Sequence, residues 1–272
     1  MSLLVEKTFE GADVPLNYAE GPVGGPPLLL LHGIADRWQT WLHLMQVLVL
    51  RWHVFALDHR GHGGSGWVGD GYGAGAYASD AAAFLEANAG APAAVIGHSL
   101  GARTAALLAA DRPELVRALV LEDPPMRPPR PDAPRGVGSR FAEERQLLAN
   151  TRDFDELLEG LRRIYPEADD AENRDRARKR SLLDPEVFEA AFGPRATSVP
   201  GADSVLRRIR APTLLVHGNP ELGSIVSDDD VQRAAALVAD FAAVRIQGVG
   251  HGIHRGRPVE FARIVTDFVE SL

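Results

Sequence analysis

The residues with the clearest chemical potential lie in the segment GHSLG at 97–101, which matches the pattern G-x-S-x-G. An apolar run at 92–96 precedes this segment, and a helical pattern follows it at 100–111. A sharp turn between strand and helix holds the central serine in strained backbone geometry, and the two glycines let neighbouring backbone pass. The pattern therefore predicts that Ser99 is a nucleophile whose hydroxyl stands free at the edge of a sheet.

A candidate base lies late in the chain, where His251 stands between two glycines. Its segment follows the last strand pattern and precedes the final helical pattern. A histidine on such a loop suits a general base that takes the proton of a serine hydroxyl. His254, three residues further on, is the competing histidine.

A serine nucleophile also needs hydrogen-bond donors for the oxyanion of its tetrahedral intermediate. One donor is the backbone N–H of the residue after the nucleophile, Leu100, and the other comes from the loop after an earlier strand. The apolar run at 27–31 leads into such a loop, so we expect Ile34 to supply the second N–H. We expect His32 to have a structural role, with its ring packed against this loop.

Short apolar runs alternate with longer helical patterns, which is typical of an α/β fold with a mostly parallel sheet. The first two runs flank a short turn and predict an antiparallel hairpin at one edge. The later runs are nearly continuous in Val, Leu, Ile and Ala, as expected where helices cover both faces of the sheet. We expect strands at 3–9, 14–19, 27–32, 52–57, 92–97, 116–122, 212–217 and 241–247. Helices are expected near 38–50, 76–89, 100–111, 228–239 and 258–271.

The alternation is interrupted once, from Asp123 to about Asp203. Prolines crowd the first part of this interruption and exclude regular helix or sheet there. An insertion so much longer than an ordinary loop predicts a separate unit. We expect a core formed by 1–124 and 204–272, with a helical cap at 125–203 over one end of the sheet; the alternative is a surface excursion with no role at the site. The charged helical segments of this cap are expected at 141–165, 168–182 and 184–192.

These segments resemble the α/β-hydrolase fold family along essentially the full length of the chain. The resemblance implies a mostly parallel sheet of about eight strands with helices on both faces. It also implies that Ser99 is the nucleophile, His251 the base, and the backbone of Ile34 and Leu100 the oxyanion hole. Serine at the nucleophile position argues against haloalkane dehalogenases and epoxide hydrolases, which have aspartate there. The matching segments are LLLLHGIADRWQTW, FALDHRGHGGSG, VIGHSLG, LVLEDPP, PTLLVHGNPEL and GVGHGIHR.

The acid that orients the base has two candidate positions, both after a predicted strand and before His251 in the chain. In most relatives the acid follows the strand expected at 212–217, which makes Glu221 a candidate. A minority take it from the end of the preceding strand, which is Asp123 here. We prefer Asp123, because Pro124 and the proline after it fix its direction. Lesser alternatives are Glu122 and the acidic run at 228–230, which is expected to cap a helix.

The predicted activity is that of a cofactor-independent serine hydrolase that cleaves an ester-like bond through an acyl-enzyme, as a carboxylesterase or lactonase. C–C bond hydrolase, thioesterase and perhydrolase activities are alternatives on the same fold, and fold does not choose among them. A non-hydrolytic lyase, cyclase or oxygenase, and a ligand receptor, are competing classes. We expect Trp38, Trp41 and His98 to line a substrate pocket; for the two tryptophans, packing in the core is the alternative.

Composition and charge exclude several kinds of partner and of site. The net charge of −8 gives no electrostatic case for binding nucleic acid or an anionic membrane. The absence of cysteine excludes disulfides, thiolate metal sites and a cysteine nucleophile. The first residues do not resemble a signal peptide, and the longest apolar runs are of strand length. We therefore expect a cytoplasmic monomer or homodimer without metal or cofactor, acting on a small apolar or aromatic ester-like substrate.

Overall fold

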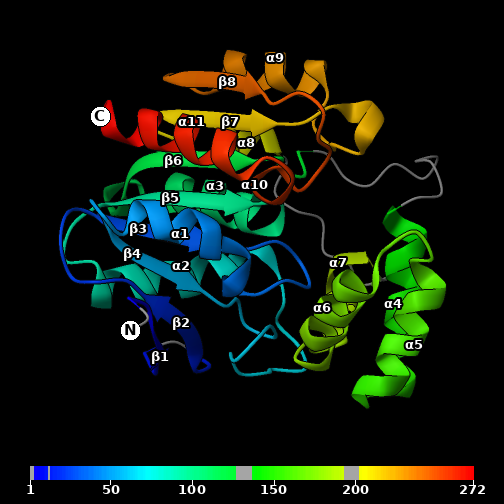
Figure 1. Ribbon diagram of the computed structural model, residues 1–272. Helices are drawn as coiled ribbons and strands as arrows, with labels where there is room; N and C mark the ends of the chain where they lie inside the picture. Colours follow the sequence, from blue (N-terminus) through cyan, green and yellow to red (C-terminus); the bar gives the residue numbers. More distant parts are fainter. Residues whose placement is uncertain (1–2, 12, 127–136, 193–201) are drawn as a thin grey trace.

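The computed structural model describes residues 3–11, 13–126, 137–192 and 202–272, with 137–139 described for their backbone only. It contains an eight-stranded sheet in the order β1-β2-β4-β3-β5-β6-β7-β8. The pairs β1–β2 and β2–β4 are antiparallel and the other neighbours are parallel, which confirms the predicted fold class (Figure 1). The strands are β1 (Val5–Phe9), β2 (Leu16–Glu20), β3 (Pro27–Leu31), β4 (His53–Leu57), β5 (Ala93–His98), β6 (Val116–Glu122), β7 (Thr213–His217) and β8 (Phe241–Arg245).

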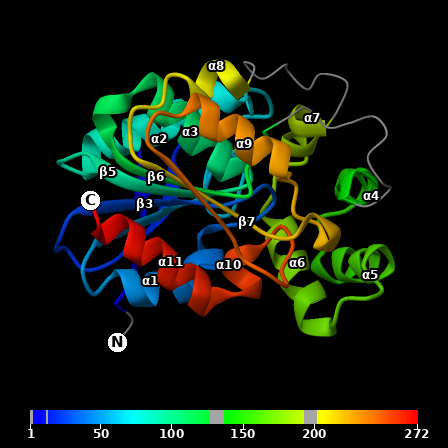
Figure 2. The same ribbon diagram turned by 90° about the horizontal axis from the view of Figure 1, so that it is seen from above.

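Helices cover both faces of this sheet, as Figure 2 shows in a view from above. One layer contains α1 (Leu42–Leu48), α10 (Ile253–Gly256) and α11 (Pro258–Glu270), and the other contains α2 (Ala74–Asn88), α3 (Leu100–Asp111), α8 (Ala202–Leu206) and α9 (Asp228–Leu237). Successive residues of β3 point to opposite faces, so Leu28 and Leu30 belong to one core cluster and Leu29 and Leu31 to the other. Burial on both sides explains why these strands are continuously apolar.

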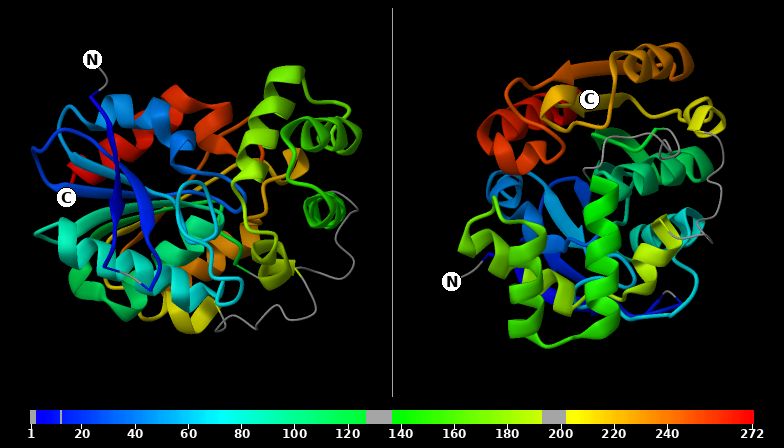
Figure 3. Two further views of the ribbon diagram at one scale, coloured as in Figure 1. Left: turned by 90° about the horizontal axis from the view of Figure 1, so that it is seen from below. Right: turned by 90° about the vertical axis from the view of Figure 1, so that its right-hand side faces the viewer.

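Four further helices, here named the cap helices, stand apart from these layers beside the carboxyl ends of the strands (Figures 1 and 3). They are α4 (Val137–Asn150), α5 (Phe154–Ile164), α6 (Asp170–Ser181) and α7 (Glu186–Phe192). The helical segment expected at 141–165 is divided between α4 and α5, because Asp153 begins a new helix by accepting the N–H groups of Asp155 and Glu156. The proline-rich segment at 127–136 lies outside the described residues, and the predicted limits of the insertion stay a prediction.

Short 3₁₀ turns complete the fold: η1 (Trp38–Trp41), η2 (Pro113–Leu115) and η3 (Pro220–Leu222). Within the described ranges, no helix has both the length and the apolar character needed to cross a membrane.

Candidate active site

The turn between β5 and α3 places Ser99 at the N-terminus of the helix. Its backbone has φ 51° and ψ −111°, a strained geometry for a residue with a side chain. The close approach depends on the neighbouring glycines: a Cβ on Gly97 would lie 2.3 Å from the Gly101 carbonyl oxygen, and one on Gly101 would lie 2.1 Å from that of Leu31. The structure therefore has the strand–turn–helix context that the pattern G-x-S-x-G predicts.

Parallel strand register brings Ser99 beside Asp123. His98 of β5 pairs with Glu122 of β6, so the residue after each strand lies at the same edge of the sheet. The Ser99 N–H donates to the Glu122 carbonyl oxygen at 2.9 Å and fixes this alignment. Adjacent strand ends thus carry both residues toward the loop that contains His251.

His251 meets a carboxylate through its Nδ1 atom, which lies 2.6 Å from Oδ2 of Asp123. Asp123 is fully buried, whereas the His251 side chain is 29% exposed. An imidazole held in this way keeps its Nε2 available for proton transfer. The arrangement has the geometry of an acid–base pair beside a serine.

The Asp123 carboxylate is oriented by the segment that follows β7. Ser224 Oγ donates to Oδ1 at 2.6 Å, the Ile225 N–H donates to Oδ2 at 2.9 Å, and the Val226 N–H donates to Oδ1 at 3.3 Å. Three donors thus fix the direction of this carboxylate. The segment after β7, where the resemblance places the acid of most relatives, therefore orients the carboxylate of the neighbouring strand end.

Glu221 does not occupy the equivalent place. It is exposed on η3, where its Oε1 accepts a hydrogen bond from Asn219 Nδ2 at 2.7 Å. The acidic run at 228–230 also has another role, since Ser227 and Asp230 form a capping box at the start of α9.

The loop after β3 lies directly against the nucleophile. A Cβ on Gly33 would lie 3.4 Å from that of Ser99. The Asp36 N–H donates to the Gly33 carbonyl oxygen at 3.2 Å and closes a tight turn. Ala35 has φ 58° in this turn, which costs about 1 kcal/mol relative to a right-handed conformation. The side chains of Ile34 and Leu100 pack against the apolar cluster of the cap helices.

Asp36 connects this loop to two cationic side chains. Its Oδ2 lies 2.6 Å from Arg255 Nη1, and its Oδ1 lies 3.1 Å from Lys179 Nζ. Burial alone would raise the pKa of Asp36, but Arg255 and Lys179 lower it well below its usual range. The loop therefore carries a buried carboxylate that stays ionised.

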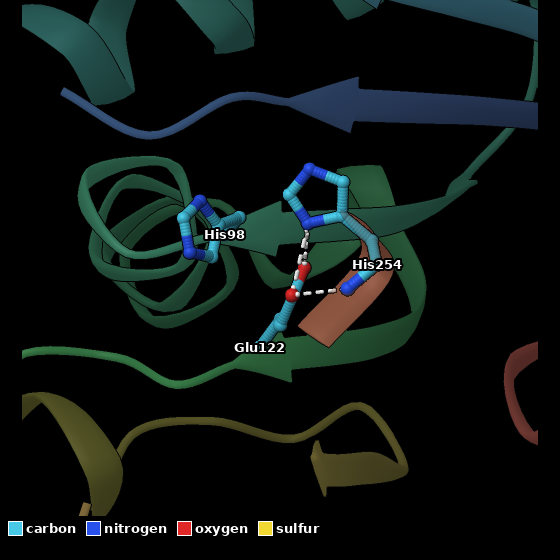
Figure 4. Close-up of side chains that lie close together, drawn as sticks. All are labelled: His98, Glu122 and His254. Atoms are coloured by element: carbon cyan, nitrogen blue, oxygen red, sulfur yellow. Dashed lines mark hydrogen bonds and ion pairs between the residues drawn. The ribbon is translucent and has the colours of Figure 1, made fainter. Parts of the chain in front are cut away.

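His254, the competing histidine, is committed to another partner. Its backbone N–H and its Nδ1 donate to Oε1 of Glu122 at 2.8 and 2.9 Å, and its Nε2 lies 2.7 Å from Thr40 Oγ1. Both side chains are buried. Glu122, a lesser alternative for the acid, thus holds the loop of His251 in place through His254 (Figure 4).

A metal site is the other possible interpretation of this group, because nitrogen and oxygen atoms of His98, Glu122 and His254 lie within 4.8 Å of one another. Hydrogen bonds account for the pair of Glu122 and His254 and for one ring nitrogen of His98. Both Glu122 oxygens bond to His254, and His98 Nε2 donates to the His251 carbonyl oxygen at 3.0 Å. Glu122 and His254 are thus bonded to each other, whereas His98 stands beside this pair and bonds to the backbone of His251 (Figure 4), and we assign no metal to the three residues.

The predicted pocket residues require a correction. Trp41 is fully buried in the core, where its ring is tilted against that of His254 and stacked on that of Phe261. Trp38 is also a core residue, and its indole donates to Glu6 Oε1 at 2.9 Å. Both tryptophans therefore pack in the core instead of lining a pocket, because η1 directs their indoles toward the sheet. His98 is buried beneath His251 rather than lining a pocket, and burial, followed by the neighbouring His251 and His254, lowers its pKa well below the usual range.

His32 also has a structural place. Its Nδ1 lies 2.8 Å from the Gly33 carbonyl oxygen, and its Nε2 accepts the His59 N–H at 3.1 Å. Burial lowers the pKa of His32, so its ring stays neutral.

Two features beside the site were not predicted from the sequence: the pair of Glu122 with His254 and the buried position of Arg180. The sequence does indicate the pair of Glu122 with His254. Glu122 is next to Asp123, and His254 lies three residues after His251, so a contact between Asp123 and His251 also brings the other two residues near each other. For Arg180 there is no such indication, because it lies among many charged residues of α6 and only the packed structure shows that it is buried.

Comparisons with known proteins agree with this fold. The family model of the alpha/beta hydrolase fold matches residues 26–257. A 2-(acetamidomethylene)succinate hydrolase from Mesorhizobium japonicum is 30% identical over 259 residues, which cover 91% of this chain and 89% of the relative. Lipase LipV from Mycobacterium tuberculosis is 28% identical over 90% of this chain and 94% of its own length. The crystal structure of an E-2-(acetamidomethylene)succinate hydrolase superposes with a TM-score of 0.77 at 27% identity, covering 98% of this chain and 99% of that one. The chain belongs to the α/β hydrolase fold family.

Proposed function

We propose that the protein is a serine hydrolase that cleaves an ester-like bond through an acyl-enzyme. The observation that carries this proposal is the hydrogen bond between His251 and Asp123 beside the strained turn of Ser99. A serine alone is a weak nucleophile, and an oriented imidazole supplies the base that activates it.

In this mechanism Ser99 attacks the carbonyl carbon while His251 takes the hydroxyl proton. Asp123 holds the imidazole in one tautomer and stabilises its positive charge. The N–H groups of Ile34 and Leu100 bind the oxyanion. His251 then returns the proton to the leaving group, and water hydrolyses the acyl-enzyme by the same steps.

The class of substrate follows from what lies over the site. The apolar cluster of the cap helices includes Leu157 and Phe188 and reaches the side chains of Ile34 and Leu100. We propose that these helices cap the site and that the substrate presents a small apolar or aromatic acyl group. The first candidates are carboxylic esters and lactones.

A second candidate is hydrolysis of an N-acyl compound that also carries carboxylates. The relative of 30% identity is named for such a compound, 2-(acetamidomethylene)succinate. The same triad suits this reaction, because attack on an amide carbonyl also passes through a tetrahedral oxyanion. C–C bond cleavage, thioester hydrolysis and perhydrolysis are further alternatives.

A substrate panel tests the proposal. We expect turnover of p-nitrophenyl esters or lactones of short chain length, compared with thioesters, diketones and 2-(acetamidomethylene)succinate under identical conditions. Ser99→Ala should retain the fold and lose activity by a factor of about 10⁴ to 10⁶. Retention of more than a few per cent of activity in Ser99→Ala would contradict the mechanism.

A further inference from the structure

A buried arginine connects the cap helices to the loop that carries the candidate oxyanion donor. Arg180 lies near the end of α6 and is 7% exposed. Its Nη1 donates to the carbonyl oxygen of Ala35, and its Nε donates to the carboxylate of Glu144 on α4. One guanidinium thus bonds to two elements that are far apart in the chain, an arrangement that its planar fork of donors allows.

Neighbouring charges reinforce the same connection. Lys179, the preceding residue on α6, lies 3.1 Å from Asp36 Oδ1 through its Nζ. Arg255, four residues after His251, binds the other Asp36 oxygen at 2.6 Å. The cap helices therefore bind two consecutive residues of the loop, Ala35 and Asp36, and the segment that follows the candidate base binds Asp36 as well.

The bonded carbonyl belongs to the strained residue of the turn. Ala35 is the third residue of this turn and has φ 58°. A positive φ at that position of a tight turn usually requires glycine. A residue with a side chain persists in such a conformation when its surroundings hold it there. Rotation of the turn about Ala35 would also redirect the preceding N–H groups, including that of Ile34.

We propose that Arg180 is a positioning residue for the oxyanion hole: it holds the Ala35 carbonyl, and so keeps the Ile34 N–H directed at the site of the oxyanion. This role rests on the proposed function. It makes α6 part of the catalytic apparatus, because transition-state binding depends on a contact made by the cap helices. A purely structural role would need only the bond between Arg180 and Glu144.

Two variants separate these roles. Arg180→Lys keeps a positive charge beside Glu144 and removes the second nitrogen that reaches Ala35. Glu144→Gln is the matched control, because it weakens the pair within the cap helices and leaves the bond from Arg180 to Ala35 in place. For each variant we would measure kcat and KM on p-nitrophenyl butyrate, Ki for a trifluoromethyl ketone of the same chain length, and Tm.

We expect Arg180→Lys to lower kcat by about 10- to 100-fold and to raise Ki by a similar factor, with KM within about threefold. These factors lie below the full loss of one oxyanion donor. Glu144→Gln should leave kcat and Ki within about threefold even though its Tm falls. Unchanged kcat and Ki in Arg180→Lys, or losses that follow Tm equally in both variants, would overturn the proposal.

A replacement variant covers the case in which Arg180→Lys does not fold. The double variant Arg180→Met with Glu144→Leu replaces both buried charges by apolar side chains. The same outcomes are then expected for kcat, Ki and KM. Each result is expressed as a ratio to the value for the unchanged protein. If the proposed function is wrong, the unchanged protein itself shows no turnover and no inhibition, so the two failures can be distinguished.

Discussion

The Nδ1 atom of His251 lies 2.6 Å from Oδ2 of Asp123, although the two residues are 128 positions apart in the chain. Strand register explains how they meet. Asp123 follows β6 at the carboxyl edge of the sheet, and its N–H donates to the Val216 carbonyl oxygen of β7 at 2.9 Å. Asp123 is thus anchored between two strands, with its side chain directed toward the loop after β8.

This geometry predicts different effects for the two candidate acids. Asp123→Asn should reduce kcat by about 10⁴, since the amide favours the wrong imidazole tautomer and does not stabilise the imidazolium. Glu221→Gln should change kcat by less than about threefold, because Glu221 is exposed and bonds to Asn219. Steady-state kinetics on one ester measures both variants, and a larger loss in Glu221→Gln would reverse the assignment.

The buried pair of Glu122 and His254 predicts an effect on stability. One Glu122 oxygen accepts both the backbone N–H and the Nδ1–H of His254. The other oxygen also lies 2.8 Å from this Nδ1, so in Glu122→Gln the amide NH₂ that replaces one oxygen faces a donor, and we expect the free energy of unfolding to fall by about 1 to 3 kcal/mol. Urea denaturation measures this change, with the exposed Glu260→Gln as control. Equal stability of the two variants would contradict the positioning role of this pair.

Buried histidines predict a loss of stability in acid. Burial, followed by the nearby His32, lowers the pKa of His62 from 6.5 to about 3. Above pH 6.5 both the folded and the unfolded chain are neutral at this residue. As the pH falls below 6.5, only the unfolded chain takes up the proton, so His62 lowers the free energy of unfolding by about 1.4 kcal/mol per pH unit.

His62→Phe tests this dependence, because phenylalanine keeps an aromatic ring and does not titrate. Near pH 7.5 the variant should be less stable by about 1 kcal/mol, since it loses the hydrogen bond from Nδ1 to the Arg60 carbonyl oxygen. Between pH 6 and 4.5 its stability should decline less steeply than that of the unchanged protein. Parallel curves from urea titrations at these pH values would show that His62 does not contribute to the acid sensitivity.

The cap helices predict a contrast between two apolar residues. Leu161 is fully buried in their cluster, and Leu161→Ala should cost about 2 to 5 kcal/mol and expose α5 to hydrogen exchange. Phe192 is 44% exposed and stacks on Phe141, so Phe192→Ala should alter the preference for acyl chains more than stability. Hydrogen exchange and a chain-length series measure the two effects. Similar exchange in the cap helices of both variants would contradict this division.

The fold was predictable because local pattern and tertiary environment agree. The ranges of β3 to β7 were recognisable as apolar runs, since both faces of the sheet are covered there, and β6 extends over the expected residues 116–122. The nucleophile turn was recognisable because two glycines are required where backbone segments pass. Asp123 was favoured for the prolines that follow it, and it lies beside His251.

Features that depend on packing between distant segments were not predictable in the same way. The spacing of the two tryptophans in η1 is the same whether they line a pocket or pack in the core. Only the position of the sheet, which the sequence does not show, decides between these two places. The buried place of Arg180 is set by Ala35 and Glu144, which lie in other elements. Within helix 170–181 its residue type and spacing do not differ from those of exposed neighbours.

The central claim is that Ser99 is a nucleophile activated by His251. Peptide mapping after treatment with a fluorophosphonate tests it most directly, because the reagent phosphonylates an activated serine. We expect one adduct, located on Ser99, formed rapidly in the unchanged protein and slowed by a factor of at least about 10³ in His251→Ala. Absence of an adduct at Ser99, or equal rates of labelling with and without His251, would contradict the account.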